Sequence, residues 1–215
     1  MKLLLQIVLF ATPWKIRRLL MQRLWGYSIA PSAKIGYSLI LSKRLIMGEN
    51  SVIRSGNVIK QIDLLRLDSG ACIARCNLVS GVRGFETESK CRLILRENAT
   101  ITSRHFIDCS GGVEVGEYTT IAGNNSEILS HSIDPYLNRE VVHPVTVGKY
   151  CFVGTRCLFL PGSSLPDYSI LGGGAVVSKK LQNAGCLYVG SPAIMKKKLN
   201  IGDVAYFNRK ERFVD

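Results

Sequence analysis

The chain has three histidines, and two of them, His131 and His143, lie in a single stretch from Ile128 to Gly148. Histidine, with an ordinary pKa of about 6.5, can accept a proton at neutral pH. A histidine that faces a weak nucleophile, such as a hydroxyl, can therefore act as a general base. Three histidines are also a common ligand set for a catalytic zinc ion. Which chemistry applies depends on the elements that position these side chains.

The chain around these histidines has a period of six residues. Downstream of the stretch, every sixth residue is large and apolar: Val147, Val153, Phe159, Leu165, Leu171 and Val177. A period of six matches neither an α-helix nor a simple alternating strand. It is typical of a parallel β-helix, in which three short sides form a coil of about eighteen residues that packs only on its neighbours.

The same period begins near Ile29 and returns in shorter pieces, so we predict one β-helix domain over residues 27–195. The period is interrupted at 81–92 and at 128–146, and we expect both segments to be loops that leave the coil. Loops on a rigid scaffold often carry function. Residues 1–26 are predicted to be a basic amphipathic helical appendage, and residues 196–215 a short basic C-terminal helix or tail.

Charge and cysteine content restrict the environment of the protein. Residues 1–66 hold eleven Lys or Arg but only two acidic residues, so most of the net charge of +12 belongs to this third of the chain. The seven cysteines have no C-x-x-C spacing, which favours free thiols in a reducing cytoplasm. We expect no nucleic-acid partner, because aromatic stacking platforms and a recognisable binding motif are missing.

Residues 1–26 have two interpretations. On a helical wheel Lys15, Arg18 and Arg23 share one face, while the opposite face is rich in Trp and Leu, with Arg17 as a misfit whose long side chain would snorkel. This pattern is typical of a helix that lies at the surface of an anionic membrane, which would make the protein peripheral on its inner face. A β-helix also needs a cap at its open end, and the same helix would serve.

The last repeats contain sequence motifs in addition to the six-residue period. The segments "HPVTVGKYCFVGTRCLFLPGSSLPDYSILGGGAVVSKK" and "LYVGSPA" closely resemble the hexapeptide-repeat acyltransferases, and within them the maltose, galactoside and cell-surface polysaccharide O-acetyltransferases. The resemblance implies an all-β fold, a left-handed parallel β-helix. It also implies a homotrimer with active sites between subunits, acetyl-CoA as the acyl donor, and a hydroxyl of a carbohydrate acceptor, a cell-surface polysaccharide or its precursor.

The resemblance also implies roles for individual residues. The family's T-x-H-P-x-D loop segment matches residues 130–135, which makes His131 the general base, although a serine replaces the proline. Asp108, in "HFID", matches an acidic residue one coil earlier that contacts the acceptor or supports the base. We assign Asp108, Asn124 and Asp134 to acceptor binding.

For the donor, the family lays the pantetheine arm of coenzyme A along the coils. The matching residues are Phe152, Gly154, Thr155, Gly173, Ser178 and Lys179. Phe152 stands where many relatives have tryptophan, and Lys179 would lie near the phosphates. Ordinary repeat structure with solvated lysines is the alternative explanation of these positions.

The other two histidines have structural interpretations. His143 precedes a proline, and His105 falls on a small inward position. Aligning the coils places Asn57, Asn77, His105, Asn125 and Cys157 in one column, which predicts a ladder of buried hydrogen bonds. We expect no metal, because the histidine spacing does not match the carbonic-anhydrase-like zinc enzymes of this fold. Such a zinc enzyme and a non-catalytic trimeric scaffold are the alternatives to a transferase.

Overall fold

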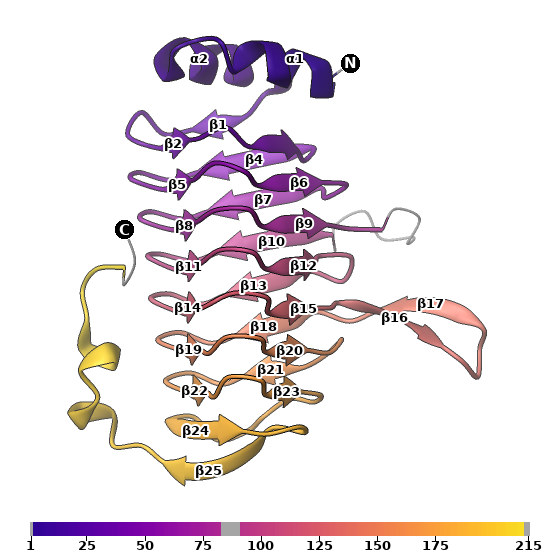
Figure 1. Cartoon of the computed structure of the whole chain (residues 1–215), viewed down its shortest axis with the longest axis vertical. Coiled ribbons are helices and arrows are strands. Elements are labelled where there is room, and N and C mark those ends of the chain that lie inside the picture. Colours follow the sequence, from indigo (N-terminus) through magenta and orange to yellow (C-terminus); the bar gives the residue numbers. More distant parts are fainter. Residues whose placement is uncertain (1, 83–90, 213–215) are drawn as a thin grey trace.

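The computed structural model describes residues 2–82 and 91–212, which form a left-handed parallel β-helix with two α-helices across one end (Figure 1). Most strands stack into three sheets that form the three sides of the solenoid, and neighbouring parallel strands in each sheet belong to consecutive coils. The β-helix predicted from the period of six is therefore confirmed. Most of the predicted loop 81–92 lies outside the described residues.

The first sheet contains, in stacking order, β1 (Ser28–Ile29), β4 (Arg44–Met47), β7 (Leu64–Leu67), β10 (Arg92–Leu95), β13 (Val113–Val115), β18 (Val145–Val147) and β21 (Ser164–Leu165). The second contains β2 (Lys34–Ile35), β5 (Val52–Ile53), β8 (Cys72–Ile73), β11 (Thr100–Ile101), β14 (Thr120–Ile121), β19 (Phe152–Val153), β22 (Ile170–Leu171), β24 (Cys186–Val189) and β25 (Ile194–Lys198). The third contains β3 (Leu39–Leu41), β6 (Val58–Lys60), β9 (Leu78–Ser80), β12 (Phe106–Asp108), β15 (Glu127–Ile128), β20 (Leu158–Phe159) and β23 (Val176–Val177).

The core is built from columns of apolar side chains, one residue from each coil. In the first sheet the paired inward residues are at most 3% exposed: Ile29, Met47, Leu67, Leu95, Val115, Val147 and Leu165. Burial of a side chain of this size contributes about 1.5–3 kcal/mol. Because neighbours in a column stand directly above one another, each coil is stabilised mainly by the coils on either side.

A ladder of polar side chains runs beside the apolar columns. Asn57 Oδ1 accepts a hydrogen bond from the backbone N–H of Asn77 at 2.9 Å, and Asn77 Oδ1 accepts from His105 N–H at 2.8 Å. His105 Nδ1 accepts from Ser126 N–H at 3.1 Å. The predicted ladder forms, but its next member is Ser126, because Asn125 has a positive φ of 56° and occupies the corner before it.

The N-terminal segment forms two helices, α1 (Lys2–Leu9) and α2 (Trp14–Trp25), instead of one, and Pro13 stands immediately before the second. Both cover the open end of the solenoid (Figure 1). Gln6 hydrogen-bonds the backbone N–H of Ile40 through Oε1 at 2.7 Å, and Trp14 donates to the carbonyl of Ala33 at 3.0 Å. The helices therefore cap the first coil. In the part of the chain that the structure describes, no helix is long and apolar enough to cross a membrane.

At the other end, β25 pairs antiparallel with β24 and ends the stack of parallel strands. The predicted boundary at residue 196 falls inside β25. The chain continues through two 3₁₀ turns, η1 (Ile201–Asp203) and η2 (Ala205–Asn208), and runs back along the solenoid (Figure 1). The hydroxyl of Tyr206 donates to the carbonyl of Cys151 at 3.0 Å, which fastens this tail to the second sheet.

Candidate active site

The stretch that interrupts the repeat forms a β-hairpin of β16 (His131–Asp134) and β17 (Arg139–Val142). It leaves the corner between the third and first sheets, after β15 and before β18, and projects away from the coils (Figure 1). At the turn, Asp134 Oδ1 accepts from the backbone N–H groups of Tyr136 and Leu137 at 2.9 and 3.1 Å. His131 is the first residue of the hairpin, so it stands where the rigid coil ends.

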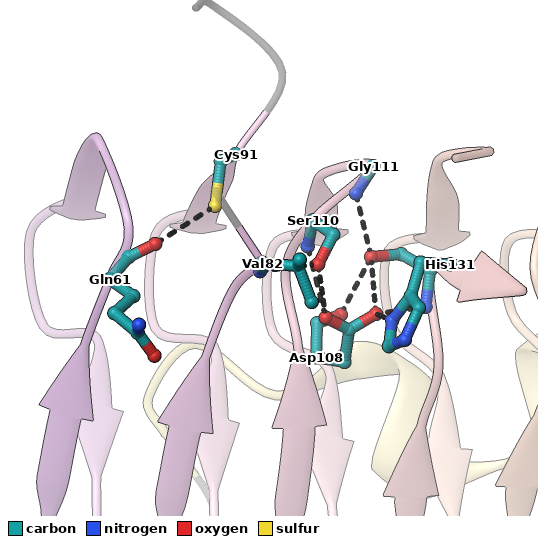
Figure 2. A network of polar contacts seen from close by, with 8 residues as sticks. Gln61, Val82, Cys91, Asp108, Ser110, Gly111 and His131 are labelled. Atoms are coloured by element: carbon teal, nitrogen blue, oxygen red, sulfur yellow. Dashed lines mark hydrogen bonds and ion pairs between the residues drawn. The ribbon is translucent and has the colours of Figure 1, made fainter. Parts of the chain in front are cut away.

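His131 lies against the carboxylate of Asp108, which ends β12 one coil earlier (Figure 2). Nδ1 of His131 is 2.7 Å from Oδ2 of Asp108. The carboxylate is 2% exposed, whereas the imidazole is 32% exposed. Since β12 and β15 are hydrogen-bonded neighbours, the stacking of the coils itself brings the two side chains together.

Two serines hold the carboxylate of Asp108 in place. Oδ1 accepts from the backbone N–H and the hydroxyl of Ser110 at 3.2 and 2.5 Å, and Oδ2 accepts from the N–H of Ser130 at 2.8 Å. Burial by itself would raise the pKa of Asp108, but hydrogen bonds from Ser110, His131 and Ser130 outweigh it and hold the pKa below its ordinary value. Asp108 is therefore a buried anion at neutral pH.

This arrangement suits proton transfer at His131. An anionic acceptor beside Nδ1 favours the tautomer with its proton on Nδ1, which leaves the lone pair of Nε2 free. The buried charge of Asp108 also stabilises the imidazolium that forms when Nε2 accepts a proton. Because Asp108 is buried, the geometry favours its role of supporting the base over contact with an acceptor.

A cysteine also lies close to this cluster. The thiol of Cys91 donates to the carbonyl of Gln61 at 3.3 Å (Figure 2). Burial raises the pKa of Cys91 to about 11. A thiol with such a pKa stays protonated at neutral pH, and the thiolate is the reactive form. Cys91 is therefore unsuited to act as a nucleophile here.

His105 lies apart from this cluster, whereas the backbone of His143 adjoins it, because its N–H donates to the carbonyl of Ser130 at 2.9 Å. Both ring nitrogens of His105 have partners: Nδ1 accepts from Ser126 N–H, and Nε2 is 2.9 Å from the hydroxyl of Thr102. Burial lowers the pKa of His105 to about 4, more than hydrogen bonds with neighbouring backbone raise it. Within residues 2–82 and 91–212, no group of three or more His, Cys, Asp or Glu is placed to hold a metal ion.

One group of predicted binding residues lies at the corner between the second and third sheets, in successive coils. Thr155 donates from Oγ1 to the carbonyl of Asn124 at 2.9 Å, and the carbonyl of Thr155 accepts from the N–H of Gly174, next to Gly173. Asn124, Thr155 and Gly173 are exposed. A Cβ at Gly154 would lie 2.7 Å from the backbone nitrogen of Gly173, so the stacking of the coils alone requires glycine there.

The remaining predicted donor residues lie elsewhere. Ser178 and Lys179 follow β23, so they occupy the same corner as His131, two strands further along the third sheet, and both are exposed. Phe152 lies in the second sheet and packs edge-on against Tyr206 of the tail, with ring centroids 5.5 Å apart. A single chain therefore brings Asp108 to His131 but does not bring the predicted donor residues into one pocket.

Sequence reasoning did not assign roles to Ser110 and Ser130. Their contacts with Asp108 depend on the register between coils, which the period does not reveal. A weak local signal exists, because a serine two residues after an aspartate often donates back to that carboxylate.

The structure also has a groove of about 620 Å³ over the first sheet, lined by Arg96, Glu114 and Lys149 among others, which contains none of the predicted site residues.

No family model matches the chain. Among solved structures, the polysialic acid O-acetyltransferase OatWY has a TM-score of 0.64 at 18% identity, over 80% of this chain and 84% of that one. The N-acyltransferase AntD from Bacillus cereus, in complex with dTDP and 3-hydroxybutyryl-CoA, has a TM-score of 0.53 at 16% identity, over 90% and 92%. A hexapeptide transferase family protein from Anaplasma phagocytophilum has 0.51 at 17%, over 84% of each chain. The chain therefore has the left-handed β-helix fold of the hexapeptide-repeat acyltransferases.

Proposed function

We propose that the protein is an acetyl-CoA-dependent O-acetyltransferase that acts on a hydroxyl of a carbohydrate, a cell-surface polysaccharide or its precursor. The observation that carries the proposal is the contact between the buried carboxylate of Asp108 and Nδ1 of the partly exposed His131, at 2.7 Å. The similarity in fold to a polysialic acid O-acetyltransferase, and to an acyltransferase solved with an acyl-CoA, supports the choice of substrates.

In the proposed reaction, His131 Nε2 accepts the proton of the acceptor hydroxyl as its oxygen attacks the thioester carbonyl. The new C–O bond gives a tetrahedral oxyanion, which needs a hydrogen-bond donor nearby. The C–S bond then breaks, and the imidazolium returns the proton to the departing thiolate of coenzyme A. Asp108 keeps His131 in the correct tautomer and orientation, so it is a positioning residue in this scheme.

The complete site needs a second copy of the chain. Asn124, Thr155 and Gly173 precede strands of the third sheet, whereas His131, Ser178 and Lys179 follow strands of the same sheet. The width of that sheet separates the two sets in one chain. We propose a homotrimer in which one edge of the third sheet faces the opposite edge in the next subunit, so that the donor lies in the groove between them.

The predicted residues divide between the two substrates. Thr155 and Gly173 are proposed to contact the pantetheine arm, and Ser178 and Lys179 the phosphates, where a cationic side chain is favourable. Asn124 and the free oxygen of Asp134 are proposed to bind the acceptor. Phe152 could contact the donor only at the edge that Tyr206 leaves uncovered. None of the seven cysteines, all of which lie in the described part of the chain, forms a disulfide, which supports a cytoplasmic location, where acetyl-CoA is made.

Thermal unfolding with acetyl-CoA, and separately with free coenzyme A, tests the donor site. A ligand at a hundred times its dissociation constant adds about 2.7 kcal/mol to the stability of the folded state. We expect both ligands to raise the melting temperature of the wild type and of His131→Ala. An unchanged melting temperature at millimolar ligand would overturn the proposal.

Acetyl transfer to a panel of polysaccharides and nucleotide sugars, followed by chromatography, tests the chemistry. We expect His131→Ala to lose at least about a hundredfold in rate, because it removes the general base. A non-catalytic scaffold would show neither the ligand shift nor a difference between the wild type and His131→Ala.

A further inference from the structure

The two N-terminal helices have an apolar surface on the side that faces away from the solenoid. We call this surface the outer helical face. Its members are 38–68% exposed: Leu3, Leu4, Leu5, Ile7, Val8, Ile16, Leu19 and Leu24. A contiguous exposed patch of large aliphatic side chains on one end of a protein marks an interaction site.

The inner side of the same helices carries buried polar residues beside the apolar Leu9 and Met21. Gln6 and Arg17 are 2% and 5% exposed. The guanidinium of Arg17 donates to the carbonyls of Ile35 and Gly36, and Nζ of Lys2 donates to the carbonyl of Ser42 at 2.7 Å. The expectation that Arg17 would snorkel to solvent is therefore wrong, because the first coil needs donors for its open backbone carbonyls.

Capping alone does not explain the apolar residues on the outer side. A cap that only protects a solenoid has a polar outer face, which keeps the protein soluble. Here the inner side satisfies the backbone of the first coil, and the outer side exposes leucine, isoleucine and valine. The outer helical face therefore needs an occupant of its own.

Charge identifies the kind of occupant. Residues 1–26 contain five basic side chains and no acidic one, and the first acidic residue of the chain is Glu49. Lys15 and Arg23 are exposed on α2, beside the apolar residues. A second copy of the same face would bring these cations together without any carboxylate to pair with them. An anionic bilayer offers both acyl chains for the aliphatic residues and phosphates for the cations.

We propose that the outer helical face lies in the interface of an anionic phospholipid bilayer, so that the protein is bound to the membrane through the capped end of its solenoid. The helices lie parallel to the bilayer surface, and the coils extend away from it. Capping and membrane binding then belong to opposite sides of the same helices.

Flotation of the full-length protein with lipid vesicles tests this proposal. The vesicles contain either phosphatidylcholine alone or phosphatidylcholine with 30% phosphatidylglycerol. We expect binding to the anionic vesicles, at least about tenfold weaker binding to the neutral ones, and weakening as salt screens the charges. Absence of binding to the anionic vesicles would overturn the proposal.

Two sets of substitutions locate the surface. Leu4→Ser combined with Val8→Ser and Leu19→Ser removes aliphatic contacts at exposed positions, and we expect at least a tenfold loss of vesicle binding. Ile194→Ser is the matched control, because Ile194 is 63% exposed in β25 at the other end of the solenoid, and it should bind like the wild type. Equal binding of the triple variant and the wild type would refute the surface assignment.

Two further measurements separate the outcomes. Sedimentation of the triple variant and the wild type without lipid would show whether a second copy occupies the face, and a wild-type assembly that the triple variant dissociates would overturn membrane docking. The melting-temperature shift with acetyl-CoA should be the same in both proteins. Vesicle binding and donor binding can therefore fail independently of each other.

Discussion

Replacing Asp108 with asparagine would remove a charge from the candidate site while keeping its shape. Oδ2 of Asp108 accepts from Ser130 N–H and from His131, so the carbonyl oxygen of the new amide should occupy that place. The amide NH₂ would then face Ser110, whose hydroxyl can turn to accept from it, although the N–H of Ser110 loses its acceptor. We expect a loss of about 1–3 kcal/mol in stability from that unpaired N–H.

The effect on catalysis follows from the charge alone. His131 would keep a hydrogen bond at Nδ1, and therefore its tautomer, but its imidazolium would lose an anion at 2.7 Å. Hydrogen bonds to charged groups contribute about 1.5–3 kcal/mol, and neutral ones about 0.5–1.5 kcal/mol. The difference, about 1–1.5 kcal/mol, corresponds to a fall in kcat of roughly 5- to 13-fold. Asp108→Ala, which also removes the acceptor for Nδ1, should lose about a hundredfold or more.

The assay is chromatographic detection of acetylated product under saturating acetyl-CoA, with the melting-temperature shift measured alongside. We expect kcat to fall while the response to acetyl-CoA is unchanged, because Asp108 is buried away from solvent. Asp63→Asn is the matched control: Asp63 forms an ion pair with Lys43 at 2.8 Å, and its loss should leave kcat unchanged. If Asp108→Asn kept the wild-type kcat while His131→Ala lost activity, the positioning role of Asp108 would be refuted.

Three further predictions concern stability. The pKa of His105 is about 4 in the folded protein, below the ordinary value of about 6.5. Between these pH values the unfolded chain binds more protons than the folded one. The free energy of unfolding should therefore fall by about 3 kcal/mol as the pH decreases from about 6.5 to about 4. His105→Asn, which repeats the residue type of the coil before it, should flatten this pH dependence in chemical denaturation; an unaltered slope would contradict the assignment. Gly116→Ala would place a Cβ 2.5 Å from the backbone of the next coil and should lower the free energy of unfolding by more than about 2 kcal/mol. Gly202→Ala is the control, because the nearest atom to its new Cβ would be 3.9 Å away, and it should have little effect on the melting curve. Gln6→Ala leaves the N–H of Ile40 unpaired and should lower the free energy of unfolding by about 1–3 kcal/mol; a change below 0.5 kcal/mol would mean that water replaces the glutamine.

The parts of the molecule that follow from the period of six were predictable. An apolar residue at every sixth position must point inward in a three-sided coil, which predicts the stacked columns such as Leu67 and Leu95. The interruption before Val145 likewise indicated that a segment with His131 leaves the coil. These features depend on local pattern, which a single sequence carries.

The contacts between coils were not predictable in the same way. The bonds from Ser110 and Ser130 to Asp108 require knowing which residues of adjacent coils stand side by side. A shift by one residue at the corner of Asn125 was enough to misplace one member of the polar ladder. The position of Arg17 was predicted wrongly for a related reason. Its hydrogen-bond partners are backbone carbonyls of the first coil, and a helical wheel takes no account of them.

The stack of similar coils also acts as a molecular spacer. In the third sheet, β15, which precedes the hairpin of His131, stands four places after β3, which lies in the coil beneath the helices. At about 4.8 Å between neighbouring strands, His131 is held about 19 Å above that coil, and the diameter of a helix adds about 10 Å. On a bilayer this reach would favour glycans that extend well beyond the headgroups over sugars attached directly to lipid. A gain or loss of one coil would change the reach by one strand spacing and leave the chemistry of His131 intact.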